Sequence, residues 1–169
     1  MLEVTEILKS AGVEDHGTAV LVITPDACKI ECPTVGERVL WVVLPRQPQR
    51  VRLPDTDGAP VRLPLVDCTF SVVIAYRLLR PGMDVLPLFA EALRVLALEG
   101  RLVVVTELAD LGSAPLPQGG HAILTQRVLR SIGVTNARFV DLSTSVIAVA
   151  DHPATRSGGL RSVNNATRL

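Results

Sequence analysis

The chain has 169 residues, of which 48% are hydrophobic and only 3% are aromatic, and its formal net charge is zero. This length fits one domain whose core is built from Val, Leu, Ile and Ala, the mixture typical of buried parallel strands. The balanced charge indicates neither a nucleic acid nor an acidic membrane surface as a partner.

The first half of the chain predicts one helix and two buried strands. A short helix over residues 3–11 is stopped by Gly12, and the apolar runs at 19–24 and 38–44 have the length of strands. Residues 45–64 hold five prolines, so turns and extended pieces should dominate there. Any third strand, at residues 60–63, is expected to be short and near an edge of the sheet.

The second half of the chain continues the alternation. Residues 69–76 predict a strand and residues 84–98 a helix, with Asp84 as its N-terminal cap and Gly100 at its C-terminal cap. Another buried strand follows at 101–107.

After a Gly/Pro loop at 112–120, a helix is expected over 121–132, with Gly133 as its stop. Strands at 137–142 and 145–150 are separated by only two residues, which predicts an antiparallel hairpin.

This pattern predicts an α/β fold with three layers around a mainly parallel sheet, closed by an antiparallel C-terminal hairpin. The polar, Gly/Ser-rich composition from residue 153 onwards divides the chain into a domain at 1–152 and a flexible tail or linker at 153–169.

Residues Leu63 to Glu107 resemble the second half of a class I methyltransferase, the family that uses S-adenosylmethionine (SAM). The family typically shows a Leu-Pro loop, a Phe-Asp-hydrophobic strand, a helix with Arg-Val-Leu, a Gly turn and an apolar strand. The matching pieces are Leu63-Pro64, Phe70 to Val73, Leu93 to Leu96, Glu99-Gly100 and Arg101 to Val105. The resemblance covers residues 63–150 and implies a Rossmann-like methyltransferase fold.

In that fold the strand at 145–150 would lie between those at 101–107 and 137–142. Central strands are covered on both faces, so we expect four of their side chains to be buried: Val72, Ile74, Val103 and Val105.

The cofactor half departs from the methyltransferase pattern. No glycine follows the first strand before Gly36, and Pro25 removes an amide donor. The second strand ends at Leu44 and Pro45 with no acid for the ribose, and Ser71 stands where the family often has Asp. We therefore expect residues 24–37 not to form a cofactor cradle. A cavity open between Thr24, Leu44 and Ser71 and occupied by SAM would overturn this expectation.

The order of features also resembles the N-terminal methyltransferase-like domain of the anamorsin family of cytosolic iron–sulfur assembly proteins. The similar parts are residues 17–22, 70–74, 91–96, 129–134, the final strand and the polar linker. The resemblance implies a cytoplasmic, non-catalytic protein-interaction domain that supports electron transfer and docks a diflavin reductase. It implies no cofactor in this chain, since the clusters would lie on a cysteine-rich C-terminal domain and no cysteine follows Cys68. The alternative is a SAM-dependent methyltransferase with a diverged pocket.

The candidate partner-binding surface is a basic stretch made of Arg46, Arg50, Arg52 and Arg62. No aromatic residue interleaves with these arginines to stack bases, so RNA is not the expected partner.

The cysteines and histidines predict no active or metal site. Cys28 and Cys32 lie four residues apart, but a metal site would need Cys68 and His16 to join them, and ordinary thiols are the favoured interpretation. Asp67 and Cys68 lack a nucleophile-elbow pattern, which argues against nucleophilic catalysis with a distant histidine. The acidic residues near the N-terminus and the absence of a long apolar run predict neither secretion nor a membrane span.

Overall fold

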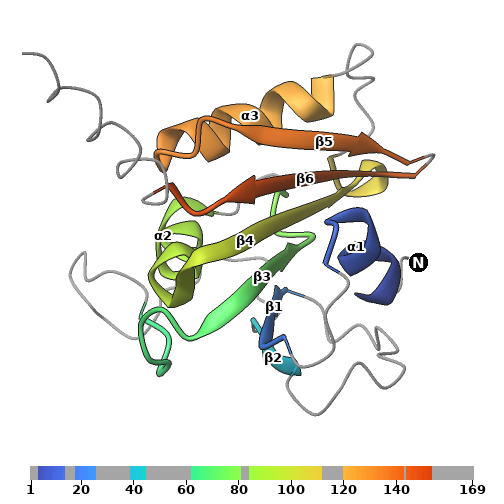
Figure 1. The fold of residues 1–169 in the computed structure, drawn as a ribbon. Helices are drawn as coiled ribbons and strands as arrows, with labels where there is room; N and C mark the ends of the chain where they lie inside the picture. Colours follow the sequence, from blue (N-terminus) through green and yellow to red (C-terminus); the bar gives the residue numbers. More distant parts are fainter. Residues whose placement is uncertain are drawn as a thin grey trace, which may run out of the picture.

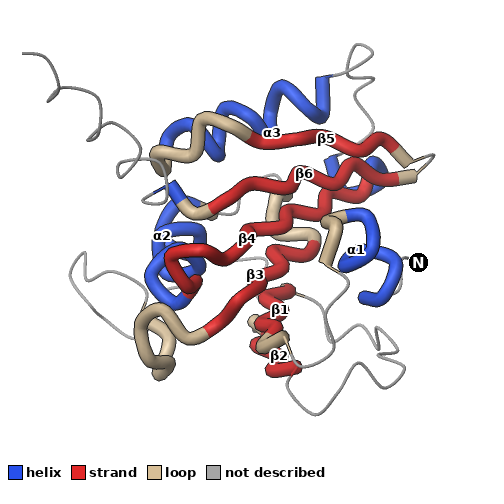
Figure 2. Tube along the Cα trace, viewed as in Figure 1, coloured by secondary structure: helices blue, strands red, loops and turns tan. Residues whose placement is uncertain are grey.

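The computed structural model describes residues 4–13, 18–25, 39–44, 62–80, 84–111, 120–142 and 144–153. Within these ranges the chain forms one six-stranded sheet with helices packed on both faces (Figure 1 and Figure 2). None of the described helices is long and apolar enough to cross a membrane.

The sheet has the strand order β2-β1-β3-β4-β6-β5. Strands β2, β1, β3 and β4 run parallel, whereas β6 is antiparallel to both β4 and β5. This confirms the predicted α/β class, the terminal hairpin, and the position of the last strand between its two neighbours. The strands are β1 (Val20–Thr24), β2 (Val39–Val43), β3 (Phe70–Tyr76), β4 (Leu96–Glu107), β5 (Ala137–Asp141) and β6 (Ser145–Asp151).

The two faces of the sheet bury separate apolar clusters. Helix α1 (Val4–Ser10) covers one face, while α2 (Leu86–Val95) and α3 (Gly120–Ser131) cover the other. A short 3-10 helix, η1 (Leu108–Leu111), follows β4. The four side chains expected in the centre are at most 2% exposed, as predicted: Val72, Ile74, Val103 and Val105.

Two helices end at the glycines that the sequence indicated. Gly12 and Gly133 adopt φ of +69° and +85°, a conformation that glycine reaches without steric cost. In each case the amide of the glycine and that of the residue after it donate back to helix carbonyls, as in Val134 N to Leu129 O at 2.9 Å. Arg101 then fastens α1 to the sheet by donating from Nη1 to the carbonyl oxygens of Ala11 and Gly12.

The predicted ends of helix α2 were wrong. The helix begins after Val85, which is buried and takes the N-cap position without a side-chain hydrogen bond, whereas Asp84 is exposed. It ends at Val95 rather than near Leu98. Asp84 would be the better N-cap by local preference. The burial of Val85 in the core outweighs that preference and sets where the helix begins.

Tertiary contacts decide where α2 stops. Its last four carbonyl oxygens, those of residues 92–95, accept hydrogen bonds from Leu96 N, His152 Nε2, Cys68 N and Thr69 N. The orphan carbonyls of the helix end are thus satisfied by other parts of the chain. No left-handed glycine is needed, and Gly100 lies inside β4 instead of at a cap.

The predicted third strand at 60–63 is not found at residues 62 and 63, the part of it that the structure describes. Arg62 and Leu63 lie outside any strand, and residues 60–61 are outside the described ranges. Leu63 is instead buried against α2, to which its amide is hydrogen-bonded through Glu91. The predicted tail from residue 154 onwards and the connection at 26–37 also lie outside the described residues.

Candidate functional site

The reversal of strand order between β1 and β3 marks where α/β sheets of this type bind ligands, at the carboxyl ends of the strands. At the end of β1, Thr24 and Pro25 are buried. The amide of Leu44, just after β2, donates to Thr24 O at 2.8 Å, and the Leu44 side chain packs on the apolar core. The position at which a methyltransferase would hold the ribose with an acid therefore carries a core leucine.

Charged side chains gather at the carboxyl ends of β3 and β4 and form what we call the carboxyl-end cluster: Tyr76, Arg77, Arg80, Glu107 and Asp110. Arg77 donates to both carboxylate oxygens of Asp110, from Nε at 2.6 Å and from Nη2 at 2.5 Å. Its Nε also lies 3.4 Å from Glu107 Oε2, and Arg80 Nη2 lies 3.4 Å from Asp110 Oδ1. The Tyr76 hydroxyl donates to Glu107 Oε1.

The backbone brings these groups together. Arg77 leaves β3 in the left-handed region with φ of +56°, while its amide still donates to Val105 O at 2.8 Å. A non-glycine residue in this conformation is uncommon and is held here by the contacts of its side chain. Helix η1 turns the chain after β4 so that Asp110 meets Arg77.

The cluster was missed by the sequence reasoning, although its signal was present. Arg77 and Arg80 follow one predicted strand, and Glu107 and Asp110 end or follow the next strand of the parallel sheet. Among the described residues of the cluster, two guanidinium groups face two carboxylates, so their formal charges balance. Its chemical effect is to fasten the segment after β3 to η1.

Ser71 does not belong to this end of the sheet. Its amide donates to Ala19 O at 3.0 Å, before the start of β1, whereas Thr24 ends that strand. Ser71 therefore lies at the other end of the strands from Thr24 and Leu44, and the three residues do not meet at one end of the sheet. Ser71 lies near the amino end of β3, and the strand itself separates it from the carboxyl ends.

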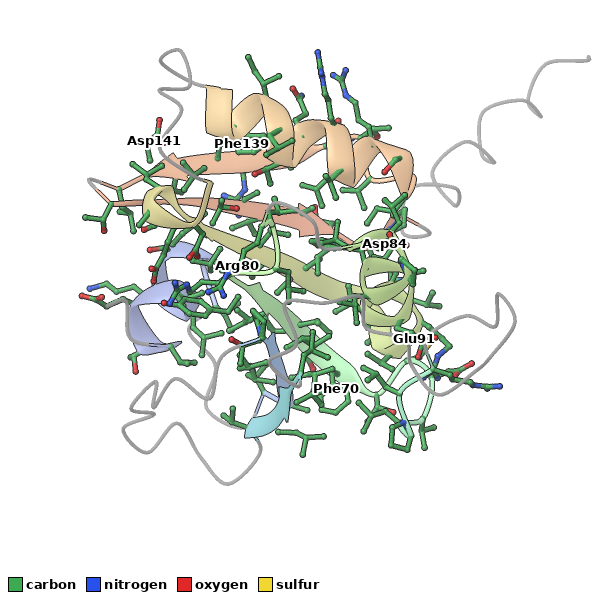
Figure 3. The ribbon with its side chains drawn as sticks, turned by 180° about the vertical axis from the view of Figure 1, so that it is seen from behind. Phe70, Arg80, Asp84, Glu91, Phe139 and Asp141 are labelled. Carbon is green, nitrogen blue, oxygen red and sulfur yellow. The ribbon has the colours of Figure 1, made fainter. Side chains whose placement is uncertain are left out.

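A second polar cluster lies at α2, and Figure 3 shows its Glu91 well apart from Arg80 of the carboxyl-end cluster. Arg94 donates from Nε to the two Glu91 oxygens at 3.0 and 3.1 Å, and it also pairs with Asp67. Its Nη1 donates to Leu65 O at 2.9 Å and its Nη2 to Leu63 O at 3.1 Å. Glu91 Oε2 in turn accepts the amide of Leu63 at 2.8 Å.

This arrangement, the Glu91–Arg94 clamp, gives the methyltransferase-like motifs a structural role. The Leu-Pro loop at Leu63 and the Arg of the Arg-Val-Leu helix hold one another, and neither reaches the carboxyl ends of the strands. The guanidinium of Arg94 lowers the pKa of Glu91 below its ordinary value of 4.5; burial opposes this shift and the amide of Leu63 adds to it.

The lowered pKa of Glu91 predicts a pH-dependent contribution to stability. Because the folded-state pKa lies below the unfolded one, the contribution is complete above about pH 4.5 and is lost as the pH falls through the folded value. We expect Glu91→Gln to be less stable than the wild type by about 1–2 kcal/mol at neutral pH. This difference should shrink in urea unfolding curves measured from pH 6 to about pH 3. A difference that stays constant over this range would mean that the Glu91 charge does not stabilise the fold.

Most of the sequence-predicted partner surface lies outside the described residues. Arg46, Arg50 and Arg52 fall in the undescribed segment, and Arg62 is exposed. Cys28, Cys32 and His16 are likewise outside the described residues. Cys68 is an exposed free thiol, and no group of metal-ligating side chains occurs within the described ranges.

Asp67, the neighbour of Cys68 in the sequence, and His152, a histidine distant from Cys68 in the chain, have other partners. Asp67 accepts a hydrogen bond from Arg94, and His152 Nε2 lies 3.3 Å from Leu93 O, to which it donates. His152 thus serves the C-terminal end of α2, where a histidine is favourably placed. His121 is the second residue of α3.

Comparison with solved structures supports the methyltransferase-like fold. The chain is similar to a SAM-dependent methyltransferase from Aquifex aeolicus, with a TM-score of 0.58, 15% identity, and 88% of each chain covered. It is also similar to the [4+2]-cyclase SpnF, with a TM-score of 0.54, 15% identity, and coverage of 89% of this chain and 80% of that one. No family model matches the sequence, and no curated protein matches it. At this level of identity the likeness establishes the fold alone.

Proposed function

We propose that this chain is a non-catalytic protein-interaction domain of an anamorsin-like protein, built on a methyltransferase-like fold. In this role it would dock a diflavin reductase and support electron transfer in cytosolic iron–sulfur cluster assembly. The redox centres would belong to another domain.

The observation that supports this proposal most is the carboxyl-end cluster. Two pairs of groups that could orient a cofactor or substrate at the ends of β3 and β4 are engaged with one another: Arg77 is bonded to both oxygens of Asp110, and Tyr76 to Glu107. A ligand would have to displace these charge-assisted hydrogen bonds before it gained any of its own. Leu44, packed on the core after β2, adds to the argument because it offers the ribose hydroxyls no acceptor side chain.

The alternative function is a SAM-dependent methyltransferase with a diverged pocket. The likeness to the Aquifex aeolicus methyltransferase, which covers most of both chains, is the observation that keeps this alternative in view. The likeness to a [4+2]-cyclase shows that the same fold is also found in a protein named for a different reaction. The fold therefore does not distinguish between the two functions. Only the chemistry of the site can do so.

A SAM titration separates the two functions. Because Leu44 supplies no acceptor side chain after β2 and the described charges at the ends of β3 and β4 pair with one another, we expect isothermal calorimetry to detect no binding at SAM concentrations up to about 1 mM, equivalent to a binding free energy weaker than about −4 kcal/mol. An active class I methyltransferase titrated under the same conditions is the positive control. Binding of SAM at micromolar concentrations or tighter would contradict the proposal and favour the alternative.

A further inference from the structure

Four of the described arginines form ion pairs with described acids, and four exposed ones do not: Arg62 before β3, Arg138 on β5, and Arg127 and Arg130 together on α3. Arg77, Arg80, Arg94 and Arg101 each form an ion pair with an acid. Arg127 and Arg130, both exposed on α3, make no ion pair with any described residue. In the described part of the chain, α1 and α2 each carry an acid beside their base, whereas α3 carries its two arginines and no acid.

Apolar side chains adjoin these arginines on the outer side of α3. Ile123 is 53% exposed and Leu124 is 38% exposed, although both are large aliphatic residues. Positions 123, 127 and 130 are spaced four and three residues apart, and 124 precedes 127 by three, so the four residues share one helix face. We call Ile123, Leu124, Arg127 and Arg130 the outer stripe of α3.

The fold does not need this stripe. Helix α3 attaches to the sheet through the opposite side, where Thr125 and Leu129 are buried and Thr125 Oγ1 lies 3.5 Å from Thr106 Oγ1. Figure 1 shows α3 lying along β5, at the edge of the sheet farthest from β2, with its outer side turned away from the sheet. Replacements in the stripe can therefore change binding without removing a core contact.

We propose that the outer stripe of α3 docks an acidic protein surface that has an apolar centre. The proposal rests on the proposed function, since it names the surface through which such a domain would bind its partner. Ile123 and Leu124 would supply the desolvated centre of the interface, and the two arginines would pair with carboxylates at its rim. A protein is favoured over a nucleic acid because no aromatic side chain stands in the stripe to stack bases.

The surface is tested first with a defined probe, a synthetic amphipathic helix of leucine and glutamate, titrated into the full ¹⁵N-labelled chain. We expect amide shifts concentrated at residues 120–131, and binding that weakens with rising salt because the Debye length shortens. Arg127→Glu with Arg130→Glu should weaken this binding roughly tenfold or more, and Ile123→Ser should also weaken it. The matched control is Arg138→Glu, an exposed arginine on β5 outside the outer stripe, which should leave binding within about twofold.

The partner is tested separately by titrating a purified diflavin reductase with the same variants. Loss of reductase binding in the α3 double variant, but not in Arg138→Glu, supports both proposals. A wild-type chain that binds the acidic helix but no reductase contradicts the proposed function and leaves the α3 surface supported. Shifts spread away from α3, equal binding by the double variant, or tighter binding of a single-stranded oligonucleotide through the same arginines would overturn the α3 surface as a protein-docking site.

Discussion

Replacing Arg94 by leucine is expected to lower the free energy of unfolding by about 3 kcal/mol. The change leaves the Glu91 carboxylate without its cation, and Glu91 is only 8% exposed. It also removes the donors to the carbonyl oxygens of Leu63 and Leu65, which join the loop before β3 to α2. Unfolding in urea followed by circular dichroism measures the loss.

Arg130 provides a matched control for this experiment, because it is the penultimate residue of α3 just as Arg94 is the penultimate residue of α2. Arg130 is exposed, so Arg130→Leu should change stability by no more than about 0.5 kcal/mol. Arg94→Lys keeps the positive charge but loses the planar guanidinium group with its several donors. Its free energy of unfolding should lie between those of the wild type and Arg94→Leu. Equal effects of the two leucine variants would show that the clamp does not stabilise the domain.

Replacing Gly100 by alanine is expected to cost about 2–3 kcal/mol. A Cβ at this position would lie 2.8 Å from Ala97 O and 2.9 Å from Ser71 O, both backbone atoms, and 2.6 Å from Leu96 Cδ1. The chain approaches β3 closely here, where the pairing shifts from Phe70 with Leu96 to Val72 with Arg101. The two strands would have to separate to admit a methyl group, and thermal unfolding would report the loss as a lower Tm.

The comparison variant is Gly133→Ala, which isolates the cost of a left-handed backbone. Gly133 has φ of +85° and no atom within 4 Å of an added Cβ, so only conformational strain opposes the change. We expect this variant to lose about 1 kcal/mol. If Gly100→Ala costs no more than Gly133→Ala, then close packing at the start of β4 is not what requires a glycine there.

These two predictions bear on how the methyltransferase-like motifs are interpreted. Arg94 and Gly100, which carried much of the resemblance, hold the loop before β3 and the entry into β4. Their roles are structural, which explains why such motifs identify the fold and not the activity. The carboxyl-end cluster, which lies where activity would be found, contains none of the residues through which the resemblance was seen.

The sequence could predict where the candidate site lies in the fold but not which of its side chains would contact one another. Parallel strands bring their carboxyl ends to one edge, so the neighbourhood of Thr24, Arg77 and Glu107 followed from strand direction alone. Arg77 has a positive φ and binds both oxygens of Asp110. This contact depends on helix η1, which is too short to show a helical periodicity in the sequence.

The sequence by itself determined the fold class, the hairpin, the six strands of the sheet apart from the start of β4, and the helix stops at Gly12 and Gly133. These depend on apolar periodicity and on backbone preferences, which act between residues close in the chain. Only the tertiary structure decided where α2 ends and what Glu91, Arg94 and Gly100 do. Helix α2 stops at Val95 because amides from Cys68 and Thr69, and the ring of His152, complete its last carbonyls. Those donors come from segments distant in the chain, and local preference carries no information about which distant groups will meet.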